Sequence, residues 1–313
     1  MVMQMIWFII ISTVVLLLLI VLAVFFKIAF VRGNLSAVNN LDSPVNRPLV
    51  PFKKTVEKGM EFIKRQPHKE LQIKSFDGLK LYADYYENNS DATIILFHGY
   101  RSSGRRDFCC AVEMYYKMGM NVLLVDQRSH GRSEGRLITY GVKERYDVLK
   151  WVDFVNKEYN TPKILLGGMS MGATTVLLSA GLDLPSNVKG IIADCGFTSP
   201  KDIILKVAKQ SFKINAKPIF PIFNAMCRIL GKFDMNGVST ANALKENEIP
   251  VLLIHGKSDN FVPVEMSQTA FDSMSGDKKY ICLVDGADHG FSFLIEPQRV
   301  REELEKFIGD CRK

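Results

Sequence analysis

The stretch Gly168-Met169-Ser170-Met171-Gly172 lies between a predicted strand and a predicted helix of this 313-residue chain. The apolar run Lys-Ile-Leu-Leu-Gly at residues 163–167 precedes it, and Ala-Thr-Thr-Val-Leu-Leu at residues 173–178 follows it. A Gly-x-Ser-x-Gly sequence at a strand-to-helix turn is the pattern of a nucleophile elbow, which presents a serine on a sharp turn. Such a turn leaves little room for neighbouring side chains, which predicts that Gly168 and Gly172 must be glycines.

Two later strand ends supply an acid and a base. The buried-strand pattern Val-Leu-Leu-Ile-His at residues 251–255 is followed by Asp259, and the predicted strand at residues 279–284 leads to His289. The carboxyl ends of neighbouring parallel strands converge on one crevice. A histidine activates a serine hydroxyl by taking its proton, and a carboxylate fixes the tautomer of the histidine. The sequence therefore predicts a triad of Ser170, His289 and Asp259.

Other side chains compete for two of these roles. Asp285 and Asp288 are alternative acids, but they share one loop with His289, and Asp259 arrives from a different strand end. His130 and His255 are alternative bases. His255 ends a strand directly before the turn of Asp259, which favours a structural role for it.

Backbone groups are expected to stabilise the negative oxygen that forms during acyl transfer. A predicted strand at residues 93–97 leads into the loop that begins His98-Gly99-Tyr100. In this arrangement the donors are the N–H groups of the residue after the nucleophile and of a residue in the loop after the third strand. We assign them to Met171 and Tyr100.

The order of these motifs resembles the α/β-hydrolase superfamily, in particular its lipase, esterase and serine-aminopeptidase-like branch. The resemblance begins near Leu71 and runs to residue 313. It rests on the following segments: His98-Gly99, Asp-Gln-Arg-Ser-His-Gly-Arg-Ser at 126–133, the elbow, His-Gly-Lys-Ser-Asp at 255–259, and Asp-His-Gly at 288–290. It implies an eight-stranded, mostly parallel sheet flanked by helices, and an acyl-transfer site with no metal and no cofactor. It does not imply a substrate, because this fold serves many functions.

The chain is expected to divide into three parts. These are a transmembrane anchor at residues 1–32, a linker and amphipathic connector at 33–70, and a catalytic domain at 71–313 with a cap insertion at about 197–248. Within the catalytic domain, Asp77-Gly78 predicts a hairpin between strands at 71–76 and 79–86. A helix is expected at 140–159.

The cap is expected to contain helices at residues 199–212 and 221–231. Its many apolar residues have two interpretations. They either form the core of the cap, or they line an acyl-chain site or a surface that enters a bilayer.

The N-terminal segment has the length and composition of a membrane span. Residues 1–26 carry no charge, and residues 5–26 form about 33 Å of helix, enough for a hydrocarbon core of about 30 Å. A cleaved signal peptide would have a basic start and a shorter apolar run, so a retained anchor is favoured. The positive-inside rule places the catalytic domain in the cytoplasm, since these basic residues follow the span: Lys27, Arg32, Arg47, Lys53, Lys54, Lys58, Lys64 and Arg65.

The charge and cysteine patterns argue against a nucleic-acid-binding protein, a disulfide-rich secreted domain and a CxxC zinc or redox site. The formal charge of +7 suits an anionic membrane surface, and because it is dispersed and has no nucleic-acid motif, a nucleic-acid partner is not expected. The connector helix at 52–65 either rests on lipid headgroups or packs on the domain.

Six cysteines show neither a disulfide framework nor a CxxC pair. Of these, Cys195 and Cys282 are expected in the core, and the adjacent Cys109 and Cys110 either respond to redox conditions or occupy buried helix positions.

Three arginines lie in the loop that follows the predicted strand at residues 121–125, namely Arg128, Arg132 and Arg136. They either bind a substrate carboxylate or phosphate, or belong to a solvated loop in which Asp126 and His130 brace the elbow. The second interpretation is favoured.

Together these features predict a membrane-anchored serine hydrolase of carboxylic esters of small or lipid-like acids. Alternatives are a thioesterase, a serine aminopeptidase or amidase, and a non-catalytic binding protein on the same fold. Esters are favoured over amides because amides need a better-placed proton donor, and no site for a peptide terminus is evident. Oligomeric state is not predicted.

Overall fold

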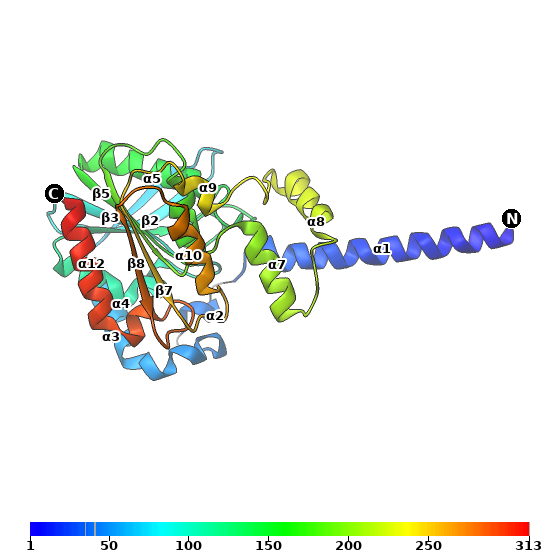
Figure 1. Ribbon diagram of the computed structural model, residues 1–313, viewed down its shortest axis with the longest axis horizontal. Helices are drawn as coiled ribbons and strands as arrows, with labels where there is room; N and C mark the ends of the chain where they lie inside the picture. Colours follow the sequence, from blue (N-terminus) through cyan, green and yellow to red (C-terminus); the bar gives the residue numbers. More distant parts are fainter. Residues whose placement is uncertain (35, 41, 313) are drawn as a thin grey trace.

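The computed structural model describes all residues except 35, 41 and 313. In the described residues, eight strands form one sheet in the order β1-β2-β4-β3-β5-β6-β7-β8. Figure 1 shows this sheet in the body of the molecule, with helices packed around it. β2 runs antiparallel to β1 and to β4, and every other neighbouring pair is parallel. The predicted eight-stranded, mostly parallel sheet is therefore confirmed. The strands are β1 (Lys69–Lys74), β2 (Lys80–Tyr86), β3 (Ala92–Phe97), β4 (Asn121–Asp126), β5 (Lys163–Met169), β6 (Val188–Asp194), β7 (Val251–Gly256) and β8 (Lys279–Val284).

Helices cover both faces of the sheet. Ile94 and Leu96 of β3 point to one core and Ile95 and Phe97 to the other, because successive side chains of a strand alternate between faces. All four are buried, as expected for a central strand covered on both sides. The first face carries α3 (Lys53–Arg65), α4 (Gly104–Lys117), α11 (Ser292–Ile295) and α12 (Pro297–Arg312); the second carries α5 (Glu144–Tyr159), α6 (Met171–Ser179) and α10 (Val264–Ser273).

The helix predicted at residues 140–159 begins four residues later than expected, as α5. Tyr140 and Gly141 have φ values of 54° and 95°, which no continuous right-handed helix allows. The Glu144 carboxylate accepts hydrogen bonds from the N–H groups of Thr139, at 2.8 Å, and Gly141, at 2.9 Å. This local network fixes a turn where the apolar spacing alone predicts helix.

The segment expected to be a linker, at residues 34–51, contains helical turns. They are α2 (Ser36–Asn39) and the 3-10 helix η1 (Pro44–Phe52). The prolines of η1 fix φ near the helical value and thereby favour such turns.

The amphipathic connector helix is present as α3 and packs on the domain, which decides between its two predicted placements. Val56 and Ile63 are buried in the core that α4 also lines. Gly59 approaches α4 so closely that a Cβ there would lie 2.4 Å from the carbonyl oxygen of Cys109. Any larger residue at this position would push the two helices apart.

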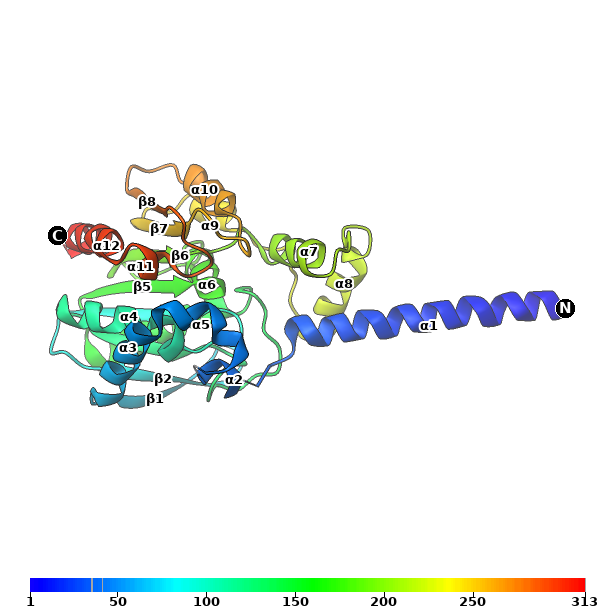
Figure 2. The ribbon, with the colours of Figure 1, turned by 90° about the horizontal axis from the view of Figure 1, so that it is seen from below.

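The insertion between β6 and β7 forms the predicted small helical cap. Its helices are α7 (Pro200–Ser211), α8 (Phe220–Met226) and the π-helical turn η2 (Cys227–Gly231), which lie together at one end of the molecule (Figure 2). α9 (Thr240–Leu244) falls inside the predicted insertion but packs against α6 and α10.

The long helix α1 (Val2–Phe30) projects from the same end as the cap (Figures 1 and 2). Among the described residues, it is the one helix long and apolar enough to cross a membrane. Its side chains up to position 21 are exposed, whereas Leu22, Phe26 and Phe30 are buried against the cap and against residues 138–142. The last turns of α1 therefore belong to the packed body of the protein.

Candidate active site

Ser170 occupies a strained turn between β5 and α6. Its φ of 53° and ψ of −114° are unusual for a residue with a side chain. A Cβ at Gly168 would lie 2.3 Å from the carbonyl carbon of Gly172, and a Cβ at Gly172 would lie 1.8 Å from the carbonyl oxygen of Phe97. Both positions therefore exclude a side chain, in agreement with the steric expectation from the motif.

The structure brings together the three side chains of the predicted triad. His289 Nε2 lies 2.9 Å from Ser170 Oγ, and His289 Nδ1 lies 2.7 Å from Asp259 Oδ2. Ser170 follows β5, Asp259 follows β7 and His289 follows β8, so the three meet at the carboxyl edge of the parallel sheet. The arrangement is a continuous hydrogen-bonded path from a carboxylate through an imidazole to a hydroxyl.

The neighbours of Asp259 hold its carboxylate in the ionised form. Its Oδ1 accepts hydrogen bonds from the N–H groups of Phe261, at 2.8 Å, and Val262, at 2.7 Å. Burial alone would raise the pKa of Asp259, but hydrogen bonds from His255 and His289 hold this pKa well below its ordinary value. Asp259 is thus negatively charged at neutral pH and can stabilise a positive charge on the His289 ring.

The alternative acids have other partners. Asp285 forms an ion pair with Lys257 at 2.9 Å. Asp288 accepts hydrogen bonds from the N–H groups of Asn260, at 3.1 Å, and His289, at 2.8 Å. Asp288 therefore ties the loop of His289 to the loop of Asp259 through backbone groups.

His255 is fully buried behind the site. Its Nε2 lies 2.9 Å from the carbonyl oxygen of Val262 and 3.2 Å from Asp259 Oδ2, and its Nδ1 lies 2.7 Å from Ser267 Oγ. His255 and His289 thus both contact Oδ2 of Asp259. These contacts agree with the structural role expected for His255.

The backbone around Tyr100 leaves one N–H group free beside Ser170. Gly99 N donates to Asp107 Oδ2 at 2.7 Å, and Arg101 N donates to His130 Nε2 at 2.9 Å. Between them, the Tyr100 N–H has no hydrogen-bond acceptor among the described residues. Asp107 and His130 thus fix the loop on both sides of the predicted donor.

Met171, the other predicted donor, is the first residue of α6. An N–H at this position has no acceptor one turn earlier within the helix.

His130 must accept through Nε2 to hold the Tyr100 loop, and it does so as a neutral ring whose Nδ1 donates to the carbonyl of Arg128 at 2.9 Å. Burial, together with the nearby His98, lowers the pKa of His130 well below its ordinary value, which keeps the ring neutral.

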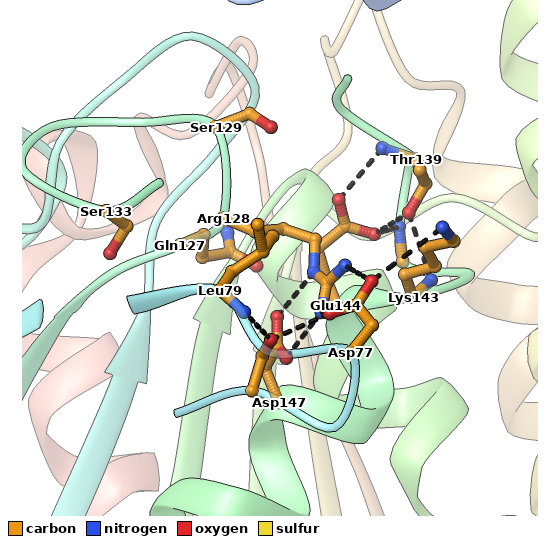
Figure 3. Close-up of polar contacts among 12 residues, drawn as sticks. Asp77, Leu79, Gln127, Arg128, Ser129, Ser133, Thr139, Lys143, Glu144 and Asp147 are labelled. Carbon is orange, nitrogen blue, oxygen red and sulfur yellow. Dashed lines mark hydrogen bonds and ion pairs between the residues drawn. The ribbon is translucent and has the colours of Figure 1, made fainter. Parts of the chain in front are cut away.

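Arg128 is buried and its guanidinium is fully paired, so both predicted interpretations of this side chain are wrong. Its Nε and Nη2 bind the carboxylate of Asp147 at 2.6 and 2.7 Å, and its Nη1 lies 3.0 Å from Asp77 Oδ2 (Figure 3). A bidentate arginine–carboxylate pair fixes orientation strongly. This pair joins the loop after β4 to α5 and to the turn between β1 and β2.

The other two arginines of this loop also lie outside the site. Arg132 pairs with Asp126 at 2.9 Å and with Asp84 at 2.8 Å. Arg136 is exposed, and its carbonyl accepts a hydrogen bond from Arg32 N at 2.9 Å. Asp126 thus stabilises its own loop and does not brace the elbow; of the two residues expected to brace, only His130 reaches the site, through the Tyr100 loop.

Two clusters in the described residues have the composition of a metal site. One consists of Cys195, Asp259 and His289, and the other of His68, Glu70 and Asp84. In the first, the imidazole and the carboxylate already bond to each other, and in the second Asp84 is paired with Arg105 at 2.9 Å. Neither cluster is needed to explain the arrangement at Ser170.

The cysteines in the described residues are all free. Cys195 and Cys282 are buried, as expected. Cys109 is buried and Cys110 half-buried in α4, with their sulfur atoms 3.7 Å apart.

Two cavities meet at Ser170. The first, which we call the charged cavity, has a volume of about 400 Å³, and its lining includes Arg106, Asp107, Asp194 and Asp288. The second, the apolar cavity, has a volume of about 320 Å³ and lies between the cap and α1. Both volumes fall in the lower part of the range of small-molecule sites, which is roughly 300–1,000 Å³.

Asp194 is a member of the site that the sequence analysis missed. Its carbonyl accepts the hydrogen bond of Ser170 N at 2.8 Å, and its side chain lines the charged cavity. Burial raises the pKa of Asp194 to about 6, although its electrostatic interactions with His255 and His289 act in the opposite direction. Its position at the end of β6, between two strands that carry site residues, was the available signal.

Known proteins resemble this chain over most of its length. Residues 88–233 match the family described as serine aminopeptidase, S33, a stretch that includes Ser170 and ends before Asp259 and His289. The uncharacterized protein YqkD of Bacillus subtilis (strain 168) is 28% identical over 219 residues, which is 70% of this chain and 71% of that protein. The thiohydrolase aneE of Aspergillus aculeatus is 31% identical over 134 residues, 41% of each chain.

Solved structures share the fold. The esterase Pf2001 of Pyrococcus furiosus has a TM-score of 0.65 and 23% identity, covering 78% of this chain and 91% of that one. Est1E of Butyrivibrio proteoclasticus, solved with ferulic acid, has a TM-score of 0.61 and 21% identity, covering 77% and 98%. At such identities the likeness establishes the architecture, while the chemistry must be argued from the site itself.

Proposed function

We propose that this chain, which has the α/β-hydrolase fold and matches the serine aminopeptidase, S33, family over residues 88–233, is a membrane-anchored serine hydrolase of carboxylic esters. Ser170 is the nucleophile, His289 the general base and acid, and Asp259 the acid that orients His289. The N–H groups of Tyr100 and Met171 form the oxyanion hole.

The reaction proceeds through an acyl-enzyme. Ser170 Oγ attacks the carbonyl carbon while His289 Nε2 takes the hydroxyl proton, and the carbonyl oxygen becomes an oxyanion. When the ester bond breaks, His289 returns the proton to the departing alcohol. Water then attacks the acyl-enzyme, His289 removes a proton from this water and gives it to Ser170, and the carboxylic acid leaves.

The observation that carries the proposal is the path from Asp259 through His289 to Ser170. Both hydrogen bonds have the length that proton transfer requires, 2.7 and 2.9 Å. A binding protein on this fold has no need of a strained serine, two side-chain-free neighbours and an aligned imidazole. The arrangement therefore favours an enzyme over the non-catalytic alternative.

Esters are preferred as substrates, and thioesters are the second candidate. The match to a thiohydrolase over part of the chain favours thioesters specifically. Both reactions use the same acyl-enzyme, and they differ in the leaving group, a thiolate being a weaker base than an alkoxide. Amide hydrolysis by an aminopeptidase ranks below them, because an amine must be protonated as it leaves.

The structure also supports a retained anchor over a cleaved signal peptide. Removing α1 would expose the partners of Leu22, Phe26 and Phe30, which are 2%, 7% and 0% exposed. It would also remove the carbonyls of Ile28 and Ala29, which accept hydrogen bonds from the Tyr100 hydroxyl. A cleaved leader would not be expected to complete the core of the mature protein.

The catalytic domain is proposed to face the cytoplasm, because Lys27 and Arg32 directly follow the apolar part of α1. A Ser275→Cys variant tests this orientation, since residue 275 is exposed and distant from α1 in sequence. In intact cells a membrane-impermeant maleimide should leave this cysteine unmodified, and permeabilisation should expose it. Modification without permeabilisation would place the domain outside.

The triad is tested with the full-length protein in detergent micelles and a series of p-nitrophenyl esters, thioesters and aminoacyl anilides. Ser170→Ala and Asp259→Asn should lower kcat by roughly 10³-fold or more, because triad members act as a unit. Asp285→Asn is the matched control, because it removes the charge of a predicted alternative acid that pairs with Lys257, at 2.9 Å, and not with the His289 ring. Its rate should stay within about tenfold of the native one.

Two results would contradict this proposal. If a fluorophosphonate probe fails to label Ser170 in the native protein, the serine hydrolase mechanism is wrong. If anilides are cleaved faster than esters, the serine hydrolase mechanism is still supported, but the assignment of esters as the substrate class is wrong.

A further inference from the structure

The apolar cavity beside Ser170 has walls from three separate parts of the chain. Leu22 and Phe25 come from α1, Val207 from α7 and Phe220 from α8, and Tyr140 comes from the loop before α5. Ser170 itself lines the cavity, so a group bound there would lie next to the attacking oxygen. The anchor helix thus forms part of the wall of the site.

The composition of this wall suits a hydrocarbon chain. Among the described residues that line it, Arg101 is the one charged side chain, and its guanidinium donates to the carbonyls of Ile28 and Val31 at 2.9 Å each. The charged cavity, which also reaches Ser170, has three carboxylates and an arginine among otherwise mainly apolar lining residues, so it offers the groups that can bind a polar alcohol. An amphiphilic ester would therefore place its acyl chain between α1 and the cap, and its polar alcohol in the charged cavity.

The end of α1 is joined directly to the loop of the proposed oxyanion hole. The hydroxyl groups of Tyr100 and Tyr140 both donate to the carbonyl of Ala29 at 2.9 Å. The last carbonyls of a helix have no partners within the helix, and here these two side chains and Arg101 supply them. These hydrogen bonds fix the position of the end of α1 relative to the loop that contains Tyr100.

The cavity opens at the end of the molecule from which α1 projects. Its rim includes Ile28, Phe212 and Ile214, all of which are exposed. The cap lies alongside the C-terminal end of α1 (Figure 2) and also exposes Ile222, Ile229 and Leu230. Exposed apolar groups gathered beside a membrane-spanning helix are suited to the acyl region of a bilayer.

We propose that the apolar cavity binds the acyl chain of a single-chain ester of a polar alcohol, that this chain enters from the bilayer between α1 and α7, and that α1 is a structural wall of the acyl site. The proposal rests on the proposed function of Ser170. A volume of about 320 Å³ holds one chain of roughly ten carbon atoms, if each methylene occupies the same volume as a water molecule in the liquid, about 30 Å³. Longer chains would extend through the rim into lipid.

The direct test uses the full-length protein in phosphatidylcholine vesicles and a decyl fluorophosphonate with a diazirine at the end of its alkyl chain. Ser170 Oγ displaces fluoride from phosphorus, which fixes the head of the probe, and light then cross-links the tail. Mass spectrometry should find the cross-links on α1 or α7. Cross-links on the charged cavity instead, for example on Phe293 or Leu304, would overturn the proposal while leaving the mechanism at Ser170 intact.

A matched pair of variants tests the same site by activity. Val207→Trp fills the cavity from α7, and Lys209→Trp adds the same bulk to an exposed position of the same helix. The ratio of kcat/KM for decanoate over acetate esters should fall about 100-fold in Val207→Trp, since each excluded methylene costs roughly fourfold. Lys209→Trp should keep the native ratio.

The outcomes separate the two proposals. Equal ratios in both tryptophan variants would overturn the acyl site, provided that circular dichroism shows both to be folded. Absence of any Ser170 labelling in the native protein would contradict the proposed function itself. Because the cross-linking experiment uses the native chain, it remains decisive even if Val207→Trp does not fold.

Discussion

On one side of Ser170, His289 and Asp259 follow neighbouring strands of the sheet, and the backbone hydrogen bonds of β7 and β8 fix their loops. On the other side, the wall of the apolar cavity consists of α1 and the cap, which reach the sheet through side-chain packing and hydrogen bonds such as that from Tyr100 to Ala29. The first side is built from regular secondary structure. The second is assembled from segments that belong to no sheet.

This difference matches what each side has to do. Proton transfer needs atoms held within a few tenths of an ångström, which a sheet edge provides. An apolar cavity needs complementary shape, and packed helices provide it with less demand on single atoms. We therefore expect the sheet side to determine whether the enzyme works, and the α1 side to determine which acyl chains it accepts.

The largest effect is expected from a substitution in the buried core of the α1 side. Phe30 is fully buried and contacts the rings of Phe26, Tyr140, Phe223 and Phe233. Phe30→Ala should destabilise the junction of α1 with the cap by roughly 3–5 kcal/mol, because a large buried ring is replaced by a cavity. The measurements are the apparent unfolding temperature in detergent micelles and the rate at which trypsin cleaves the cap after Lys213, which is exposed.

Val24→Ala is the control for this variant, since Val24 lies on α1 and is 51% exposed. It should leave both measurements near their native values. If Phe30→Ala behaves like Val24→Ala, α1 is a tether that merely touches the domain, and the contrast between the two sides of Ser170 disappears.

Much of the sheet side can be predicted from the sequence because its rules are local. The steric need for Gly168 and Gly172 follows from the turn alone, and the strands before Asp259 and His289 are continuous apolar runs. Parallel strands then bring their carboxyl ends together whatever lies between them in sequence. Asp194 obeys the same rule and escaped notice because no motif surrounds it.

The α1 side cannot be predicted in this way, because its contacts join distant segments. The hydrogen bond from Tyr100 to Ala29 spans 71 residues, and that from Tyr140 to the same carbonyl spans 111. The apolar pattern of α1 predicts a membrane span, which accounts for every side chain without any contact to the domain. Nothing in that pattern indicates that Leu22 or Phe26 would be buried.

Paired charges caused the clearest error of prediction. Arg128 stands in a loop among polar residues, which is typical of a solvated side chain. Its partners Asp77 and Asp147 come from a hairpin turn and from α5, and only the folded chain places them on either side of the guanidinium. A buried charge of this kind is recognised from its partners and not from its neighbours in sequence.

A smaller effect is expected from pH, and it should be confined to the sheet side. Asp194 lines the charged cavity and has its pKa raised to about 6, whereas the described residues around the apolar cavity include no carboxylate. Between about pH 4, the ordinary pKa of an unfolded aspartate, and pH 6, the folded protein binds the proton of Asp194 more tightly than the unfolded chain. Stability contributed by this group is therefore present below pH 4 and lost as the pH rises to 6 and above.

Asp194→Asn removes this loss, because the amide does not ionise. The unfolding temperature of the variant relative to the native protein should rise between about pH 4 and pH 7 and then stay constant. The gain is at most about 3 kcal/mol, the free energy that corresponds to a pKa of about 6 in place of about 4. Lys209→Trp, which changes a side chain on the cap, should show no such trend. A variant curve parallel to the native one across this range would mean that Asp194 has an ordinary pKa, and that this carboxyl group does not make the sheet side respond to pH differently from the α1 side.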